Sequence, residues 1–208
     1  MERDQIIEKI LKLEWGMFTN VKGADGRASC QDDKKTFIIM RKAQADVWRT
    51  YTLASYLGDL ESANKDGMNL MTIKYARMME VTFPDEYENI KDQLPSVSAE
   101  THNLVNEIVK YHLAWSIEAS KKYPRLFSLG RPVATSGIQT RHTISIENYL
   151  RSELLTYSEK TLKFCLKDTI EAFDNNANIP LEILRNTAKS YGYDSLDAIE
   201  KRLPSFYE

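Results

Sequence analysis

Apolar residues recur at intervals of three and four along most of this chain, which is the spacing that puts them on one face of an α-helix. The first segment shows the pattern clearly, with Ile6, Ile10, Leu13 and Met17 on one side. No run of alternating apolar and polar residues with turn spacing predicts a β-sheet. We therefore predict an all-α protein, a single-domain multi-helix bundle with long antiparallel helices that spans residues 1–208.

Breakers and capping residues divide the chain into expected helices. Ser98 and Asp194 are suited to cap helix N-termini, and Pro180 is suited to the first turn of a helix. Residues 124–144 form the longest stretch without helical periodicity, and long loops of this kind are often functional. Helices are predicted over about 2–19, 36–60, 69–82, 99–122, 145–173 and 180–191, with a short last helix before Pro204.

The totals exclude several classes of protein. Lys and Arg number 28 against 30 acids, and this net charge of −2 argues against a nucleic-acid partner. The apolar runs are too short to span a bilayer, so no membrane association is expected. The N-terminus lacks the pattern of a secretory signal, and Cys30 and Cys165 are too few for a disulfide framework. A cytoplasmic protein is the expectation.

One carboxylate stands out because it lies on a predicted apolar face. Ile146, Leu150, Glu153 and Tyr157 share one side of the expected helix over 145–173. Burying an unpaired carboxylate costs several kcal/mol, so Glu153 needs a partner or a proton. Two interpretations remain open: a general acid/base or cation-binding group, and an ion pair with Arg or Lys from a neighbouring helix.

Two more acids are catalytic candidates. Glu14 lies between Leu11 and Phe18 at helical spacing, so it is a second acid on an apolar edge. If Glu14 and Glu153 share a pocket, their proximity separates their pKa values. Glu147 is the third candidate, and its spacing from Arg151 also suits a surface ion pair.

Several other polar residues have both a functional and a structural interpretation. Arg27 is a possible anion contact, whereas Cys30 beside it is expected to be structural. Lys74 and Arg77 either face the acids or extend to water. His112, between Ile108 and Trp115, is expected to be a core histidine rather than a ligand-binding one. The loop with Arg131, Thr135, Ser136, Arg141 and His142 leads into a helix N-terminus, where backbone amides favour anions, but a solvated basic loop is the favoured interpretation.

Sequence signatures of cofactor and metal sites are missing. The chain has no Glu-x-x-His pair, no His-Glu-x-x-His and no Cys-x-x-Cys. It also lacks the glycine-rich phosphate loops and the Gly-x-Ser-x-Gly nucleophile motif. No metal site is predicted, no cofactor is assigned, and no feature specifies an oligomeric state.

Six blocks of sequence resemble a prokaryotic family of domains of unknown function, number 4125 in that series. The blocks are at 14–18 (Glu-Trp-Gly-Met-Phe), 26–33, 40–44 (Met-Arg-Lys-Ala-Gln), 74–80, 147–158 and 191–196. The resemblance covers nearly the whole chain and implies one prokaryotic, cytosolic domain without an established activity. Its polar positions coincide with those singled out above, although Ser152 stands where the family block is expected to have a glycine.

The leading hypothesis is a small-molecule enzyme with a polar, acid-rich pocket inside the bundle. Glu153, Glu14 and Glu147 act there by general acid/base chemistry on an anionic or zwitterionic substrate. The rival hypothesis is a non-catalytic ligand-binding or regulatory module whose acids are balanced by internal ion pairs; a protein-interaction domain is a third. The predicted substrate-binding residues are Arg27, Arg41, Gln44, Lys74, Arg77, Arg131, Trp15, Trp48, Tyr149 and Tyr157.

Overall fold

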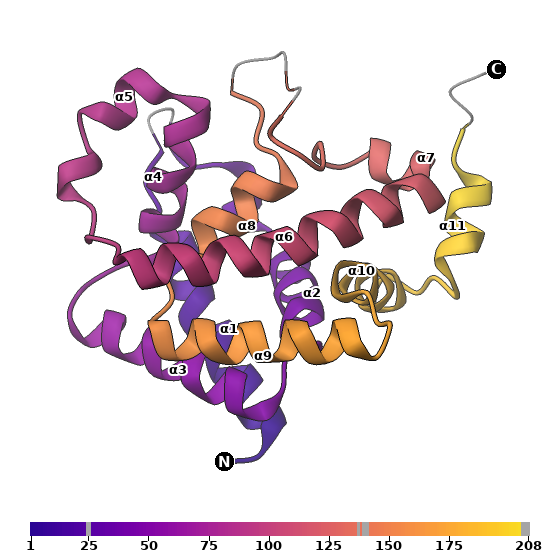
Figure 1. Ribbon diagram of the computed structural model, residues 1–208, viewed down its shortest axis with the longest axis horizontal. Coiled ribbons are helices and arrows are strands. Elements are labelled where there is room, and N and C mark those ends of the chain that lie inside the picture. Colours follow the sequence, from indigo (N-terminus) through magenta and orange to yellow (C-terminus); the bar gives the residue numbers. More distant parts are fainter. Residues whose placement is uncertain (24–25, 137, 139–141, 205–208) are drawn as a thin grey trace.

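The computed structural model describes residues 1–23, 26–136, 138 and 142–204. Within these ranges the protein is all-α and multi-helical, as predicted, and contains no β-strand (Figure 1). No helix in the described part is both long and apolar enough to cross a membrane. The α-helices are α1 (Arg3–Thr19), α2 (Lys34–Ala45), α3 (Thr50–Lys65), α4 (Leu70–Thr82), α5 (Pro84–Glu88), α6 (Ala99–Lys122), α7 (Pro124–Ser128), α8 (Ile146–Leu154), α9 (Glu159–Asp174), α10 (Ile179–Ser190) and α11 (Leu196–Arg202); two 3-10 turns are η1 (Ser29–Asp32) and η2 (Lys91–Gln93).

Neighbouring helices differ in their relative direction. Helix α8 packs antiparallel to α4, because Asn148 at its start reaches Met78 and Glu153 near its end reaches Lys74. Helices α6 and α9 instead run parallel, since Ser98 at the start of α6 donates to Glu159 at the start of α9 at 2.6 Å. Figure 1 shows these two lying side by side across the molecule. The bundle therefore combines antiparallel and parallel neighbours.

Side-chain caps fix several helix starts. The Ser98 hydroxyl accepts the Thr101 amide at 3.0 Å, and Pro180 occupies the first turn of α10, both as predicted. The last helix is capped by Ser195, whose hydroxyl accepts the Ala198 amide, rather than by Asp194. Each cap satisfies an amide that the first helical turn leaves without a partner.

The predicted helix over 36–60 is two helices in the structure, because tertiary contacts hold open the chain between α2 and α3. The Arg3 guanidinium donates to the carbonyls of Ala45, Asp46 and Trp48 at 2.9–3.2 Å, which satisfies the end of α2. Buried Asp168 of α9 accepts the Arg49 amide at 3.2 Å at the start of α3. Both partners are distant in sequence, so periodicity does not reveal the break.

The predicted helix over 145–173 is also divided. Helix α8 ends at Leu154, and the Ser158 hydroxyl accepts the Thr161 amide at 3.2 Å to begin α9. Asp59 of α3 accepts the Ser158 amide at 3.0 Å. The turn between α8 and α9 places Tyr157 against the core, where it is buried.

Removal of the Asp168 carboxylate tests the contacts that begin α3. Besides the Arg49 amide, it accepts the hydroxyls of Tyr51 at 2.6 Å and Thr52 at 2.7 Å. We expect Asp168→Ala to lower the free energy of unfolding by about 2–3 kcal/mol, since these donors lose a charged acceptor. The exposed Asp174→Ala variant at the end of the same helix should change it by less than about 0.5 kcal/mol in urea denaturation. Equal effects of the two variants would contradict the conclusion that Asp168 stabilises the start of α3.

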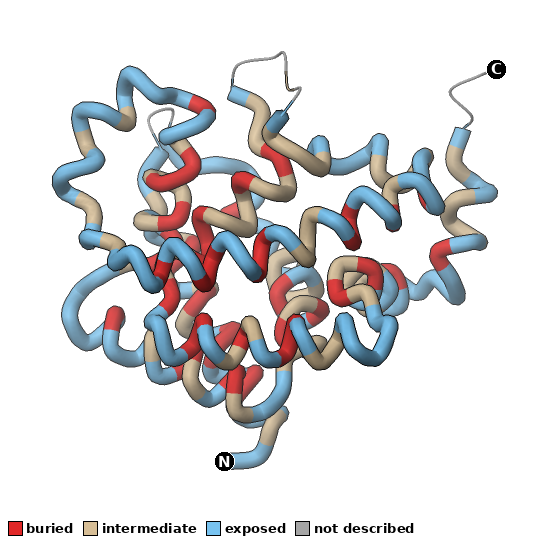
Figure 2. Tube along the Cα trace, viewed as in Figure 1, coloured by how far each residue is buried: buried red, intermediate tan, exposed pale blue. Residues whose placement is uncertain are grey.

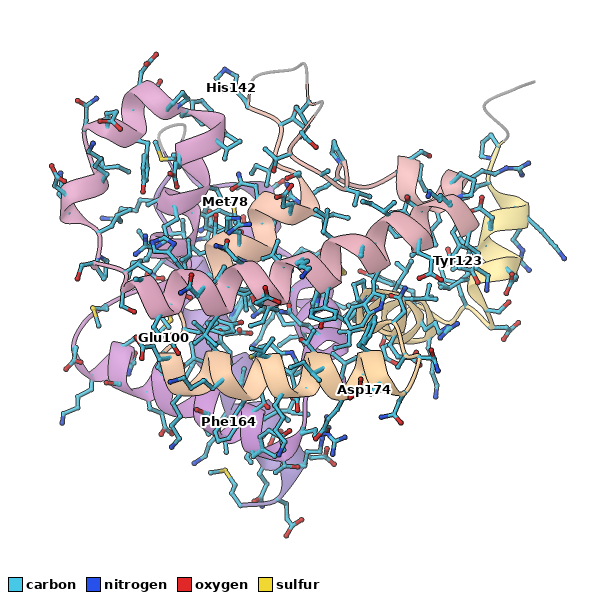
Figure 3. The ribbon with its side chains drawn as sticks, in the orientation of Figure 1. Met78, Glu100, Tyr123, His142, Phe164 and Asp174 are labelled. Carbon is cyan, nitrogen blue, oxygen red and sulfur yellow. The ribbon has the colours of Figure 1, made fainter. Side chains whose placement is uncertain are left out.

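The main apolar core lies between α1, α3, α4, α6, α8 and α9, whose buried positions face one another (Figure 2). A second cluster, built on Tyr123, Leu181 and Leu196, lies where the end of α6 meets α10 and α11. Figure 3 shows Tyr123 beside α11 and Met78 of α4 on the other side of the molecule. Helix α6 contributes to both clusters and connects them.

Candidate functional site

Four ionised side chains from four helices meet inside the main core. Glu14 comes from α1, Arg41 from α2, Lys74 from α4 and Glu153 from α8. Their exposed fractions are 1%, 8%, 1% and 3%, respectively. Charges this deeply buried require partners, and these four provide partners for one another.

Arg41 bridges the two acids. Its Nε donates to Glu14 Oε2 at 2.9 Å, and its Nη2 donates to the other oxygen of the same carboxylate. Its Nη1 donates to both oxygens of Glu153, at 2.9 and 3.1 Å, and to the side-chain oxygen of Gln44 at 2.8 Å. One planar guanidinium thus binds both carboxylates, an arrangement that lysine does not reproduce.

The remaining oxygens of the acids are also hydrogen-bonded. Lys74 Nζ donates to Glu153 Oε2 at 2.5 Å, and the Tyr157 hydroxyl donates to Glu153 Oε1 at 2.9 Å. The Tyr56 hydroxyl donates to Glu14 at 2.7 Å. Trp48 contacts both tyrosine rings edge-on, at centroid distances of 5.5 and 6.0 Å. We refer to Glu14, Arg41, Gln44, Tyr56, Lys74, Glu153 and Tyr157 as the ionic network.

The charges in the ionic network balance, with two carboxylates against two cations. Burial alone would raise the pKa of Glu153, but Arg41 and Lys74 reverse that effect and hold it below its ordinary value. Burial alone would lower the pKa of Arg41, but Glu14 and Glu153 raise it well above its ordinary value. Glu153 and Arg41 therefore stay charged at physiological pH.

A cavity of about 570 Å³ lies beside the ionic network, between α2, α6, α8 and α10. Arg41, Gln44 and Glu153 form a polar part of its wall. Most of the lining is apolar and includes Phe37, Met40, Leu113, Leu150, Ile183 and Leu184. Cavities of this size with an apolar lining and a few polar groups are typical of small-molecule sites.

Two phenols and an arginine line another part of the cavity. The Tyr149 ring contacts two cations, with Lys74 Nζ 3.6 Å and the Arg131 guanidinium carbon 5.2 Å from its centroid. Tyr75 of α4 lies nearby, and burial, followed by Tyr149 and Cys30, raises the pKa of its hydroxyl. Arg131 is exposed, so this group marks the outer part of the cavity.

A family described as a protein of unknown function, DUF4125, matches residues 4–201, which is almost the whole chain. The chain belongs to this family. Neither a curated protein nor a solved structure matches it. The family description names no activity, so only the geometry of this DUF4125 member bears on its function.

The structure brings together most of the residues that sequence patterns singled out. Glu14, Glu153, Arg41, Gln44, Lys74 and Tyr157 are all in the ionic network, with Trp48 packed against it. Tyr149 and Arg131 line the cavity. The open question of whether Glu14 and Glu153 meet has a definite answer: Arg41 joins them.

Six of the predicted binding residues do not line the cavity. Lys74 and Tyr157 belong to the ionic network and Trp48 packs against it, whereas Arg27, Arg77 and Trp15 lie apart from both. Arg27 pairs with exposed Asp32 at 2.8 Å and donates to two backbone carbonyls, so it fixes the loop before α2. Arg77 donates to the Pro95 carbonyl at 2.6 Å, and its buried Nε has no partner among the described residues. Trp15 packs edge-on against Phe37.

Glu147 has a local role at the start of α8. It lines the cavity and accepts the Thr135 amide at 2.9 Å. Arg151, its expected partner, instead donates to Asn106 at 2.6 Å. Of the loop residues predicted to bind an anion, His142 stacks on Phe83 at the outer edge of the molecule (Figure 3), and Arg141 lies outside the described residues.

His112 is a cavity residue that the sequence analysis assigned to the core. It lies on α6 and lines the cavity beside Leu113 and Val109. Burial is the one cause of its pKa shift, which lowers the value from 6.5 to about 4. Its position on an apolar stripe was the signal, but the stripe does not distinguish a packed core from the wall of a cavity.

The pKa of His112 predicts a specific dependence of stability on pH. Between pH 6.5 and 4 the unfolded chain binds a proton at this residue and the folded protein does not, so acid favours unfolding. We expect this residue to contribute about 2 kcal/mol to the loss of stability between pH 7 and 5. NMR titration of its imidazole should give a pKa near 4, and urea denaturation of His112→Phe should lack this contribution. An imidazole that titrates near 6.5 would contradict the prediction.

The described residues do not provide a set of metal ligands. Within the described residues no three His, Cys, Asp or Glu side chains are grouped to hold a metal ion. Glu14 and Glu153 are both buried, but the guanidinium of Arg41 occupies the position between their carboxylates where a shared metal ion would lie.

Proposed function

We propose that this protein binds a small, mainly apolar molecule in the cavity between α2, α6, α8 and α10. The observation that carries the proposal is the cavity itself, of about 570 Å³, with aromatic and aliphatic walls and a few polar groups. Burial of apolar ligand surface supplies the affinity, and the polar groups orient the ligand.

In this proposal the ionic network is the support of the site rather than its reactive centre. It joins α1, α2, α4 and α8, and each of these helices contributes residues to the cavity lining. Because the network is charge-balanced and hydrogen-bonded, it holds these helices in place before a ligand arrives. A preformed site binds more tightly, since less ordering remains to be done on binding.

An enzyme that acts by general acid/base chemistry on an anionic or zwitterionic substrate is the second candidate, because Glu153 and Arg41 both line the cavity. The lowered pKa of Glu153 makes it a poor proton donor near neutral pH. Ion pairs to Arg41 and Lys74 also occupy the oxygens that a substrate would need. These observations favour the binding function.

We further propose that the protein acts in the cytoplasm of a prokaryote, without a nucleic-acid or membrane partner. Its two cysteines, exposed Cys30 and buried Cys165, are free thiols, which suits a reducing compartment. The near balance of basic and acidic residues gives no electrostatic support for nucleic-acid binding.

Naphthalene is a suitable first probe for the cavity, because it is apolar, uncharged and small enough to enter. We expect saturable one-to-one binding of naphthalene by equilibrium dialysis. The Ile183→Trp variant fills the cavity and should abolish binding, whereas Ile170→Trp, at an exposed position on α9, should not. Absence of saturable binding to the folded wild-type protein, or equal binding by Ile183→Trp, would refute the proposed function.

A further inference from the structure

His112 presents a polar ring to the cavity. The side chain is half-buried and lines the cavity, and within the described residues its nitrogens have no hydrogen-bond partner. The two residues on either side of it in the cavity wall, Val109 and Leu113, are apolar. The ring nitrogens are therefore open to the cavity rather than sealed in the core, and whatever occupies the cavity, water or a ligand, is placed to hydrogen-bond them.

Ser116 lies one helical turn after His112 and also lines the cavity. Helical hydroxyls commonly donate back to a carbonyl in the preceding turn, as Thr187 does to Ile183 at 2.8 Å on the opposite wall. Ser116 makes no such bond in the described structure, although the residue is buried. Helix α6 thus offers two adjacent hydrogen-bonding groups to the cavity.

The chemistry of the surrounding wall favours an uncharged partner. The ionic network is charge-balanced, Arg131 is at the exposed end of the cavity, and the lining acid Glu147 already accepts the Thr135 amide. Burial keeps His112 neutral at physiological pH. A carboxylate beside it would bring a negative charge into the apolar cavity that the neutral ring does not balance, whereas a hydroxyl, carbonyl or amide brings no charge.

We propose that His112, with Ser116 beside it, hydrogen-bonds an uncharged polar group of a mainly apolar ligand, so the ligand class is a neutral alcohol, phenol, ketone or amide. The inference rests on the proposed function and deepens it. Apolar walls bind the body of such a molecule, while His112 fixes its orientation. This pairing selects against a pure hydrocarbon, which leaves the imidazole unpaired, and against an acid.

The test compares naphthalene with 2-naphthol, which adds one hydroxyl to the same ring system. The measured quantity is the ratio of the two affinities in each protein at pH 7, by equilibrium dialysis. We expect His112→Leu to lower the preference for 2-naphthol by about tenfold, because one hydrogen bond is lost. The matched control His102→Leu, at an exposed position of α6, should leave the ratio unchanged within about twofold.

The possible outcomes distinguish failure of the proposed binding function from failure of the proposed hydrogen bond to His112. If naphthalene itself does not bind, the proposed function fails. If naphthalene binds but the ratio is the same in wild type and His112→Leu, the hydroxyl does not meet His112, water satisfies the ring, and this inference fails alone. Tighter binding of 2-naphthoate than of 2-naphthol would also overturn it. The larger ring of His112→Phe provides a second variant if His112→Leu does not fold.

Discussion

Replacement of Arg41 by methionine is expected to lower the free energy of unfolding by about 3–5 kcal/mol, a large part of the stability of a typical domain. Methionine fills much of the same volume but removes the cation between Glu14 and Glu153. Glu14 then has only the Tyr56 hydroxyl among its present side-chain partners, and the two buried carboxylates repel each other. Lys74 alone does not balance both acids.

The matched control is Arg185→Met on α10. Arg185 pairs with Glu182 at 3.4 Å, and both side chains are about half exposed, at 49% and 50%. Exposed pairs contribute little, so the control should cost no more than about 1 kcal/mol. Urea denaturation at pH 7 gives both values from the midpoint and the slope. If Arg41→Met costs no more than Arg185→Met, Arg41 does not hold the network together.

The ionic network could be anticipated from sequence only in part. Glu14 and Glu153 each break an apolar stripe, and the cost of burying a bare carboxylate requires that each has a partner. This cost shows that Glu14 and Glu153 need partners, but it does not show which residues those partners are. Arg41 and Glu153 are 112 residues apart in the chain, and only the tertiary arrangement of the helices that carry them decides that their side chains meet.

The positions of the helices were predicted better than their interruptions. Local signals, such as the Ser98 cap and Pro180 in the first turn of α10, act within a few residues, so they can be identified from the sequence. The break between α2 and α3 depends on Arg3 and Asp168, which lie on other helices. Apolar periodicity continues through 46–49, so a local pattern predicted one helix where tertiary hydrogen bonds produce two.

The cavity could not be predicted from sequence, because a cavity is a property of how several helices pack. Leu113 and Ile183 look like core residues in any sequence pattern, and whether their side chains touch or leave a space depends on the separation of α6 and α10. The same limit applies to His112. Its unpaired nitrogens become informative only when the space beside them is known.

The ionic network compensates for packing contacts that the cavity removes. A bundle that leaves about 570 Å³ open gives up packing contacts that would otherwise hold its helices together. Directional ion pairs between α1, α2, α4 and α8 favour one arrangement of these helices, and they do so without filling the space. We infer that the network keeps the cavity open.

The second large effect is expected for Glu153→Gln, which preserves shape and removes one negative charge. Arg41 and Lys74 then face a single buried carboxylate, Glu14, and the excess positive charge should cost about 3–5 kcal/mol. Lys74→Met leaves the opposite excess and should cost a similar amount by the same argument. The two single variants are therefore both destabilising because each unbalances the network.

The double variant Glu153→Gln/Lys74→Met restores that balance, since Glu14 and Arg41 remain as one complete pair. We expect it to be more stable than the sum of the single effects predicts, by at least about 2 kcal/mol in urea denaturation. Glu153→Gln combined with Lys91→Met, whose partner Glu88 is on the surface, should instead be additive within about 0.5 kcal/mol. Additivity in both pairs would show that charge balance is not what stabilises the buried site. A coupling with Lys74 and none with Lys91 would show that Glu153 stabilises the fold as the anion of this buried ion pair.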